Sequence, residues 1–241
     1  MVKEYSGKRA FYGSERHSYK EMKKLLSVFI AASTLFMMTA CEEKTDDGER
    51  PARVNEDRVG DITLKLFPEI APVAVKNFID LAESGYYDGK LMHRIIPGFM
   101  IQGGSPFGDG MSDPSYDSFF DIEPHANAVH SYGALSMANA GPTRNAQQFF
   151  IVNEPAGTNF LDGDYTVFGH TIEGFETIDA VSSVKTGAGD KPLNDVIIDS
   201  VIIHTVDGEP DPEKLLEGNV NGNVELLPGD VYAVITMRIT G

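Results

Sequence analysis

The sequence is poor in cysteine, in positive charge and in long apolar runs, and each shortage excludes a class of protein. Cys41 is the only cysteine, so an intramolecular disulfide is excluded. Lys and Arg number 20 against 36 Asp and Glu, and the net charge of −16 argues against nucleic acid as a partner, because phosphate binding requires clustered cations. The uncharged run 25–38 is shorter than the roughly 20 residues that a membrane-spanning helix requires. The 41% of apolar residues is nevertheless enough for a packed domain.

The first 40 residues have the pattern of an export signal. A short basic stretch, Met22–Lys24, precedes the apolar run 25–38, an order typical of a secretory signal. The small Ala40 before Cys41 resembles the lipobox of bacterial lipoproteins, although Met38 stands where leucine is usual. We therefore expect acylation of Cys41 and a protein that is exported and lipid-anchored to a bacterial membrane, facing the periplasm or the cell surface. The alternatives are a buried spare thiol at Cys41 and a permanent membrane span.

The segments on either side of this signal are polar. Residues 1–21 precede a better signal start at Met22, and we interpret them as an extension from a start codon assigned too early. We assign residues 22–40 to the signal peptide. Residues 41–58 are acidic and contain Pro and Gly, a composition that cannot bury a core, so we expect a tether between the membrane and the folded domain.

Residues 59–204 have the pattern of a mainly β domain with two helices. Ile62, Leu64 and Leu66 alternate with polar residues, which indicates a half-buried strand. Pro72 and the apolar residues that follow at helical spacing predict a helix that ends at Gly85. A second helix is expected over 175–184, and further short strands are expected within 91–102 (two strands), 133–137, 148–152, 166–168 and 196–204. This succession of short strands and turns favours a barrel or a sandwich.

The segment M-H-R-I-I-P-G-F-M-I-Q-G-G (92–104) concentrates the candidate chemistry. It contains a cation, two bulky apolar residues and an amide, namely Arg94, Phe99, Met100 and Gln102. Residues two apart share one face of a strand, so Arg94, Met100 and Gln102 are expected on one side, with the intervening turn shifting Phe99. A guanidinium beside an apolar pocket suits a substrate with an apolar ring next to an amide, as in a prolyl peptide bond.

Four blocks of sequence, in order, resemble the cyclophilin type of peptidyl-prolyl isomerase: HRIIPGFMIQGG (93–104), LSMANAGP (135–142), QQFFIV (147–152) and FLDGDYTVFGH (160–170). The resemblance implies a closed eight-stranded antiparallel β-barrel capped by two α-helices, with the active site on one outer face. It also implies an enzyme that accelerates rotation of Xaa-Pro bonds, here in exported polypeptides. We expect proline-containing clients, no cofactor, no metal and a monomer.

The resemblance assigns roles to particular residues. Arg94 and Gln102 would be catalytic, with Gln102 orienting Arg94 and touching the substrate carbonyl. The substrate would be bound by a larger set, in which two aromatic and two aliphatic residues form the proline pocket: Phe99, Met100, Phe150 and Leu161, with Ala138, Asn139, Gln148, Phe160 and Tyr165 around them. Phe160 stands where well-known eukaryotic members have tryptophan, which implies weak binding of cyclosporin, and Tyr165 stands where they have histidine. Thr143-Arg144 departs from the commoner loop, which implies an altered preference for the residue before proline.

The alternative is a non-catalytic module that uses the same groove to hold proline-containing segments, or a chaperone on a membrane anchor. An enzyme needs a group that prefers the twisted amide over the planar one. Arg94 can act in this way, because a guanidinium is always charged and offers several donors. The presence of Arg94 together with Phe99, Gln102 and Phe150 favours the enzyme.

The remaining features have plainer interpretations. His93 is expected to be a structural histidine with satisfied ring nitrogens, and His125 and His130 to lie on a surface loop without the spacing of metal ligands. Phe149 and Phe168 are expected in the core. Residues 205–241 begin as an acidic linker, and the strand-like segment 231–239 either adds an edge strand, binds a partner by strand addition or is a loosely docked tail.

Overall fold

The computed structural model describes residues 58–111, 113, 118–139, 144–208 and 226–240. The predicted signal, Cys41 and almost all of the tether lie outside these residues. The strands are β1 (Arg58–Leu66), β2 (Arg94–Ile96), β3 (Met100–Gly103), β4 (Ala134–Asn139), β5 (Asn145–Val152), β6 (Val167–Glu173), β7 (Val196–Thr205) and β8 (Val231–Ile239). The helices are α2 (Pro72–Glu83) and α3 (Phe175–Ser182), with short 3-10 turns η1 (Asn159–Leu161) and η2 (Ala188–Asp190). None of the described helices is long and apolar enough to cross a membrane.

The eight strands form one antiparallel sheet in the order β2-β3-β5-β4-β6-β1-β8-β7. The sheet curls, and the segment just before β2 bonds to β7 at its other end. The amide of Met92 donates to Val196 O at 2.9 Å, and Ile198 exchanges hydrogen bonds with the backbone of residues 89 and 90. This confirms the mainly β fold of eight antiparallel strands with two helices, and a bridge between Leu91 and Ile197 joins the two ends of the sheet.

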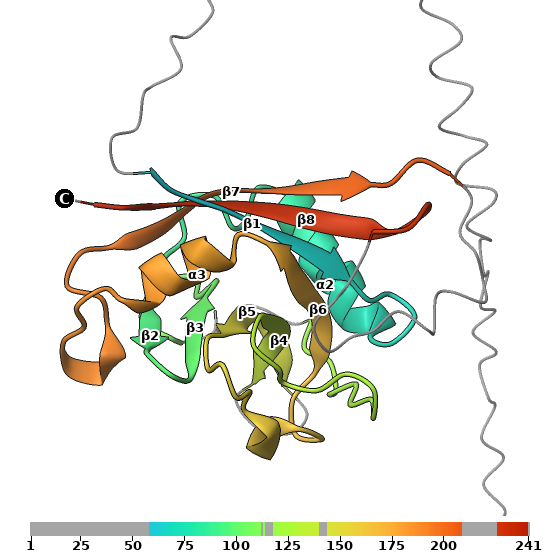
Figure 1. Ribbon diagram of the computed structural model, residues 1–241, viewed down its shortest axis with the longest axis horizontal. Helices are drawn as coiled ribbons and strands as arrows, with labels where there is room; N and C mark the ends of the chain where they lie inside the picture. The colour runs from blue at the N-terminus through green and yellow to red at the C-terminus, as the bar shows by residue number, and fades with distance from the viewer. Residues whose placement is uncertain (1–57, 112, 114–117, 140–143, 209–225, 241) are drawn as a thin grey trace, which may run out of the picture. The chain divides into compact units, whose positions relative to one another are not determined.

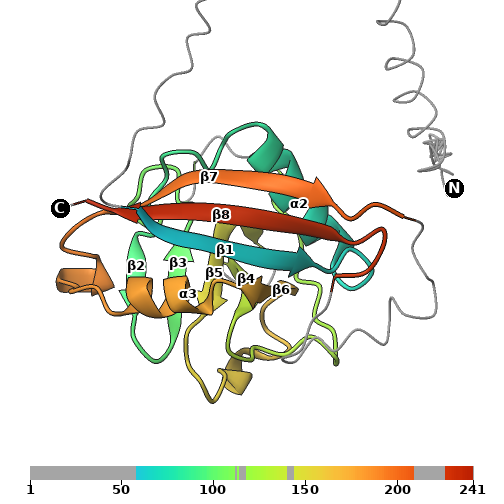
Figure 2. The same cartoon turned by 45° about the horizontal axis from the view of Figure 1, so that its top comes forward.

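Strand β8 lies between β1 and β7, not at an edge. It runs antiparallel to both, and in Figure 2 the three strands lie side by side across the molecule, with β8 in the middle. Ala233, Ile235 and Met237 point into the core, where all three are buried. The expected edge strand is therefore an interior strand, and the segment is not a loosely docked tail. The folded unit extends beyond residue 204, where the sequence pattern placed its end.

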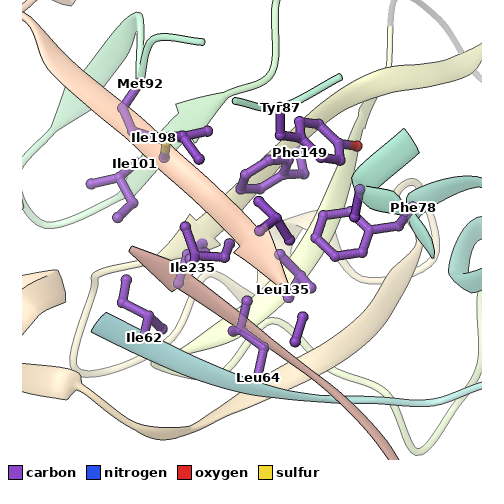
Figure 3. Close-up of a cluster of buried hydrophobic side chains, with 14 of the residues drawn as sticks. Ile62, Leu64, Phe78, Tyr87, Met92, Ile101, Leu135, Phe149, Ile198 and Ile235 are labelled. Atoms are coloured by element: carbon purple, nitrogen blue, oxygen red, sulfur yellow. The ribbon is translucent and has the colours of Figure 1, made fainter. Parts of the chain in front are cut away.

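The core fills the space enclosed by the sheet and α2 (Figures 1 and 3). Ile62, Leu64 and Leu66 point inward from β1, as their alternation predicts. The ring of Phe78 on α2 packs on Phe149 and Phe168, with centroids 5.6 and 5.3 Å away. These two phenylalanines are therefore core residues, as expected.

Helix α2 begins at Pro72, whose missing amide hydrogen suits the first helical position. The preceding residue provides no side-chain cap. Instead, the carboxylate of Glu123 accepts hydrogen bonds from Val73 N at 3.2 Å and Ala74 N at 2.8 Å. A carboxylate at a helix N-terminus satisfies unpaired amides and favours the helix dipole. Glu123 therefore ties the loop after β3 to α2.

Candidate active site

The hairpin of β2 and β3 places Arg94 directly opposite Gln102, and Gln102 in turn lies opposite Phe150 on β5. The side chain of Arg94 is 40% exposed, and its Nε lies 3.3 Å from Asp190 Oδ2. The Nε2 of Gln102 donates to Gln148 Oε1 at 3.1 Å. Among the described residues no hydrogen bond joins Gln102 to Arg94, so the expected orienting contact is not made here.

A second apolar cluster, separate from the main core, lies next to this hairpin. Its buried members include Met100, Phe150 and Leu161, and the partly buried Phe99 and Tyr165 pack against them. The ring of Tyr165 meets that of Phe150 edge-on, with centroids 5.9 Å apart. The structure thus gathers the residues of the expected proline pocket from β3, β5, η1 and the loop before β6, segments that are distant in sequence.

The rim of this pocket is aromatic. Phe160 is 73% exposed, and its ring stacks on that of Phe99 with centroids 5.7 Å apart. Phe99 is held from behind, because its amide donates to Asn153 Oδ1 at 2.7 Å. On the opposite side Asn139 donates from Nδ2 to Asp164 O at 3.0 Å. Exposed aromatic surface next to an apolar pocket suits an extended peptide whose proline ring enters the pocket.

A hollow of about 290 Å³ borders the pocket. Four of the predicted site residues line it, one catalytic and three substrate-binding, and five further residues complete its wall: Gln102, Ala138, Asn139 and Gln148, with Gly110, Met111, Phe119, Arg144 and Ala146. Gln148 also donates to Gly110 O at 2.9 Å, which holds the loop that carries Met111. Sequence reasoning did not include Gly110, Met111 and Phe119, because no pattern links their loops to the β2–β3 hairpin.

His130 is buried, which corrects its expected place on a surface loop. Its Nδ1 lies 2.7 Å from Asp162 Oδ1, and its Nε2 lies 3.0 Å from Ser136 Oγ. Burial lowers the pKa of His130 below its ordinary value, although the neighbouring carboxylate acts in the opposite direction. The ring also stacks on Phe150, with centroids 5.8 Å apart. His130 therefore supports the floor of the apolar pocket.

Asp162, His130 and Ser136 are linked in the same order as the residues of a hydrolytic triad, but the burial of Ser136 argues against that role. Ser136 is fully buried, and its hydroxyl lies 2.9 Å from Thr166 O as well as near His130. A nucleophile must reach its substrate. The three side chains form a supporting network behind the pocket and not a nucleophilic site.

His93 is buried next to Arg94, but neither of its ring nitrogens has a hydrogen-bond partner among the described residues. The described residues therefore do not confirm the expectation of satisfied ring nitrogens, although the backbone of Leu91 raises the pKa of His93 as a hydrogen-bond acceptor would. Burial lowers the pKa of His93, which favours its neutral form. The described residues include no group of three or more His, Cys, Asp or Glu placed to hold a metal ion.

Comparison with known proteins agrees with this geometry. The family model described as cyclophilin type peptidyl-prolyl cis-trans isomerase/CLD matches residues 52–203. The chain belongs to the cyclophilin family. The matched residues include the β2–β3 hairpin and the second apolar cluster, whereas β8 of this cyclophilin lies beyond them.

Individual relatives agree. The cyclophilin is 44% identical over 169 residues to a protein of Staphylococcus epidermidis that carries the name peptidyl-prolyl cis-trans isomerase, with 59% of this chain and 86% of the relative covered. A protein of that name in Staphylococcus aureus has the same identity and coverage. A Cryptosporidium parvum cyclophilin, crystallised in the presence of the dipeptide Ala-Pro, is similar with a TM-score of 0.56 and 36% identity, over 61% of this chain and 99% of that one. The present chain is therefore a peptidyl-prolyl cis-trans isomerase of the cyclophilin type.

The partner of Arg94 is the residue that sequence reasoning missed most clearly. Asp190 lies 96 residues further along the chain, in the loop between α3 and β7. It stands in a stretch of small and charged residues, T-G-A-G-D-K-P, that resembles any polar turn. Only the packing of this loop beside β2 brings the carboxylate to the guanidinium.

Proposed function

We propose that Arg94 catalyses rotation of Xaa-Pro bonds by stabilising the twisted amide, while the second apolar cluster holds the proline ring. Rotation about an amide has a barrier of about 18–20 kcal/mol, because nitrogen shares its lone pair with the carbonyl. In the twisted state the lone pair returns to nitrogen, which becomes a hydrogen-bond acceptor. A donor aimed at that nitrogen binds the twisted state more strongly than the planar one, as catalysis requires.

The magnitudes are compatible with a few such contacts. Uncatalysed prolyl isomerisation takes about 10–100 s. A rate near 10³ s⁻¹ requires four to five decades of acceleration, or roughly 6 kcal/mol. Preorganised donors in a water-poor cleft can supply free energies of this size. No bond is broken, so no nucleophile is needed.

The observation that carries the proposal is the position of Arg94. Its side chain is 40% exposed, and Arg94 stands at the end of a hairpin whose other strand supplies Met100 and Gln102. Met100 belongs to the same apolar cluster as Phe150 and Leu161. A cation with spare donors therefore lies at the border of an apolar pocket, which is the arrangement that a prolyl amide needs.

The test is isomerisation of an Ala-Pro peptide by the wild-type protein, by Arg94→Ala and by Arg58→Ala. Arg58 is an exposed arginine paired with Asp61 on β1, so it controls for loss of a surface cation. Removing one transition-state donor is expected to lower kcat about 10²- to 10³-fold, with Arg58→Ala unchanged. Equal rates for wild type and Arg94→Ala would defeat the proposed role. Inactivity of both would favour the binding module.

We propose that the clients are exported polypeptides with extended proline-containing segments, reached from a lipid anchor at Cys41. The groove, in which the exposed Phe160 stacks on the partly buried Phe99, supports an extended client, and the solved relative obtained with Ala-Pro supports proline as the ligand. The export signal rests on the sequence alone. Labelling of cells with a radioactive fatty acid should mark the wild-type chain and not Cys41→Ala. Label on both, or on neither, would refute the anchor.

A further inference from the structure

The loop between α3 and β7 approaches the site from outside the predicted groove. It contains η2 and lies beside β2 in both views (Figures 1 and 2). A polar contact between this loop and β2 joins Asp190 Oδ2 to Arg94 Nε, at 3.3 Å. The two side chains are 45% and 40% exposed, so the ion pair is partly open to water.

The backbone of Asp190 is unusual. Its φ of 60° lies in the left-handed region, and it is the only non-glycine residue with positive φ among those the structure describes. Aspartate adopts this conformation more readily than most residues, but it still costs free energy relative to glycine. Such a backbone outlier next to a candidate site points to a functional requirement for the side chain.

The loop holds this conformation through its own backbone hydrogen bonds. Gly187 N donates to Lys191 O at 2.8 Å, and Leu193 N donates to Lys185 O at 2.9 Å. The preceding Gly189 also has a left-handed φ of 69°. The loop is therefore a small hairpin that presents the carboxylate at its tip.

The way in which Asp190 binds Arg94 matters for the reaction. The carboxylate takes the Nε–H of the guanidinium, and Arg has five N–H donors in a planar fork. A bond at Nε restricts the rotation of the side chain, and the terminal N–H groups of Arg94 make no hydrogen bond with the described residues. A side chain fixed before the substrate arrives loses less conformational entropy in the transition state.

We propose that Asp190 is the positioning residue for Arg94: it holds the guanidinium in the orientation that serves the twisted prolyl amide, without touching the substrate. This inference rests on the catalytic role proposed for Arg94. The ion pair is half exposed, so its contribution is modest and sensitive to salt. Loss of the carboxylate should lower kcat about two- to fivefold and leave KM nearly unchanged.

The decisive variant is Asp190→Gly. Glycine adopts the left-handed backbone without strain, so this variant should be at least as stable as the wild type while losing the carboxylate. Asp190→Asn keeps the side-chain shape and an acceptor oxygen but loses the charge, so its kcat should fall less. If Asp190 had a purely structural role, activity would follow stability instead, and the more stable Asp190→Gly would be the more active of the two variants.

The matched control is Asp199→Asn. Asp199 makes the same type of contact in the same domain, because its Oδ1 accepts from Arg238 Nε at 2.6 Å between β7 and β8. It lies outside the second apolar cluster and the hollow. This variant changes the net charge and removes one Asp–Arg ion pair, as Asp190→Asn does. Its kcat should equal that of the wild type.

The experiment measures kcat and KM of the full-length variants on an uncharged Ala-Pro peptide by NMR exchange, from about 10 mM to 1 M salt. The wild-type kcat should fall toward that of Asp190→Gly as salt screens the ion pair, while Asp190→Gly changes little. If the kcat of Asp190→Gly at low salt were equal to that of the wild type, or higher, the proposal would be overturned. So would equal salt dependence of the two proteins.

The Arg94→Ala background separates the two proposals. At raised enzyme concentration, Asp190→Gly should cause no further loss in that background, since its effect acts through Arg94. An additional loss of the same size would overturn the positioning role. Full activity of Arg94→Ala itself would instead refute the role of Arg94. If Arg94→Ala were inactive and Asp190→Gly fully active, only the positioning role of Asp190 would be refuted.

Discussion

Strand β8 should be required for folding, although it lies beyond residues 52–203 that match the family model. Its backbone pairs with β1 on one side and β7 on the other. Termination of the chain after residue 208 would remove β8, leave both neighbouring strands with unpaired edges and open the core. We expect the truncated chain to be unfolded or strongly destabilised.

The loss can be estimated from the side chains that β8 buries. Ile235 and Met237 are fully buried, and burial of such a side chain contributes about 1.5–3 kcal/mol. With the smaller buried Ala233, the apolar loss is roughly 4–7 kcal/mol before any hydrogen bond is counted. Domains are usually stable by about 5–15 kcal/mol. The loss of β8 is therefore comparable to the whole free energy of unfolding.

A point variant gives a graded form of this test. Met237→Ala should lower the free energy of unfolding by about 2–5 kcal/mol, because Met237 is fully buried. Val234→Ala, on the outward face of the same strand, is the control and should cost less than about 1 kcal/mol. With an m-value of about 2 kcal/mol per molar urea, a loss near 3 kcal/mol lowers the midpoint by roughly 1.5 M.

Urea unfolding followed by far-UV circular dichroism measures these differences. The truncated chain should lack a cooperative transition, and the midpoints should fall in the order wild type, Val234→Ala, Met237→Ala. If the truncated chain unfolded cooperatively at the wild-type midpoint, β8 would be an accessory strand and the reasoning would be refuted.

Three further predictions concern stability. Glu123→Ala removes the acceptor for two amides at the start of α2 and should cost about 1 kcal/mol in urea unfolding; an unchanged midpoint would contradict the capping role. Gly174→Ala should cost several times more than Gly163→Ala, because both have φ of 88° but only at Gly174 would the new Cβ overlap a backbone oxygen of β1; similar midpoints would show that strain alone decides. Burial lowers the pKa of His170 in the folded chain, so the unfolded chain binds more protons between that lowered pKa and the unfolded value of about 6.5. The free energy of unfolding therefore decreases as the pH falls through this window, by at most about 1.4 kcal/mol per pH unit from this group. His170→Gln should flatten that slope between pH 7 and 5; a slope equal to that of the wild type would contradict it.

Local pattern predicted much of the fold. The alternation at Ile62, Leu64 and Leu66 identified the inward face of β1, and the helices over 72–83 and 175–182 begin at the predicted residues. These features depend on backbone geometry within one segment, which repeats every two or every 3.6 residues. Arg94 and Gln102 share one side as expected, because residues directly opposite each other in an antiparallel pair lie on the same face of the sheet.

Features that depend on distant segments could not be predicted from pattern. His130 looked like a loop histidine, because its partner Asp162 is 32 residues away and nothing in its neighbourhood indicates burial. The place of β8 was equally hidden: its strand propensity is local, but its insertion between β1 and β7 depends on two other strands having unpaired edges.

By itself, the sequence determined the types of side chain available to the site: one guanidinium, several aromatic and aliphatic groups, and three amides. Tertiary structure alone decided their partners. It joined Gln102 to Gln148 and Arg94 to Asp190, contacts across 46 and 96 residues. Hydrogen bonds and ion pairs act over a few ångströms between atoms, whatever their separation along the chain, so only the packed fold determines which charge orients Arg94.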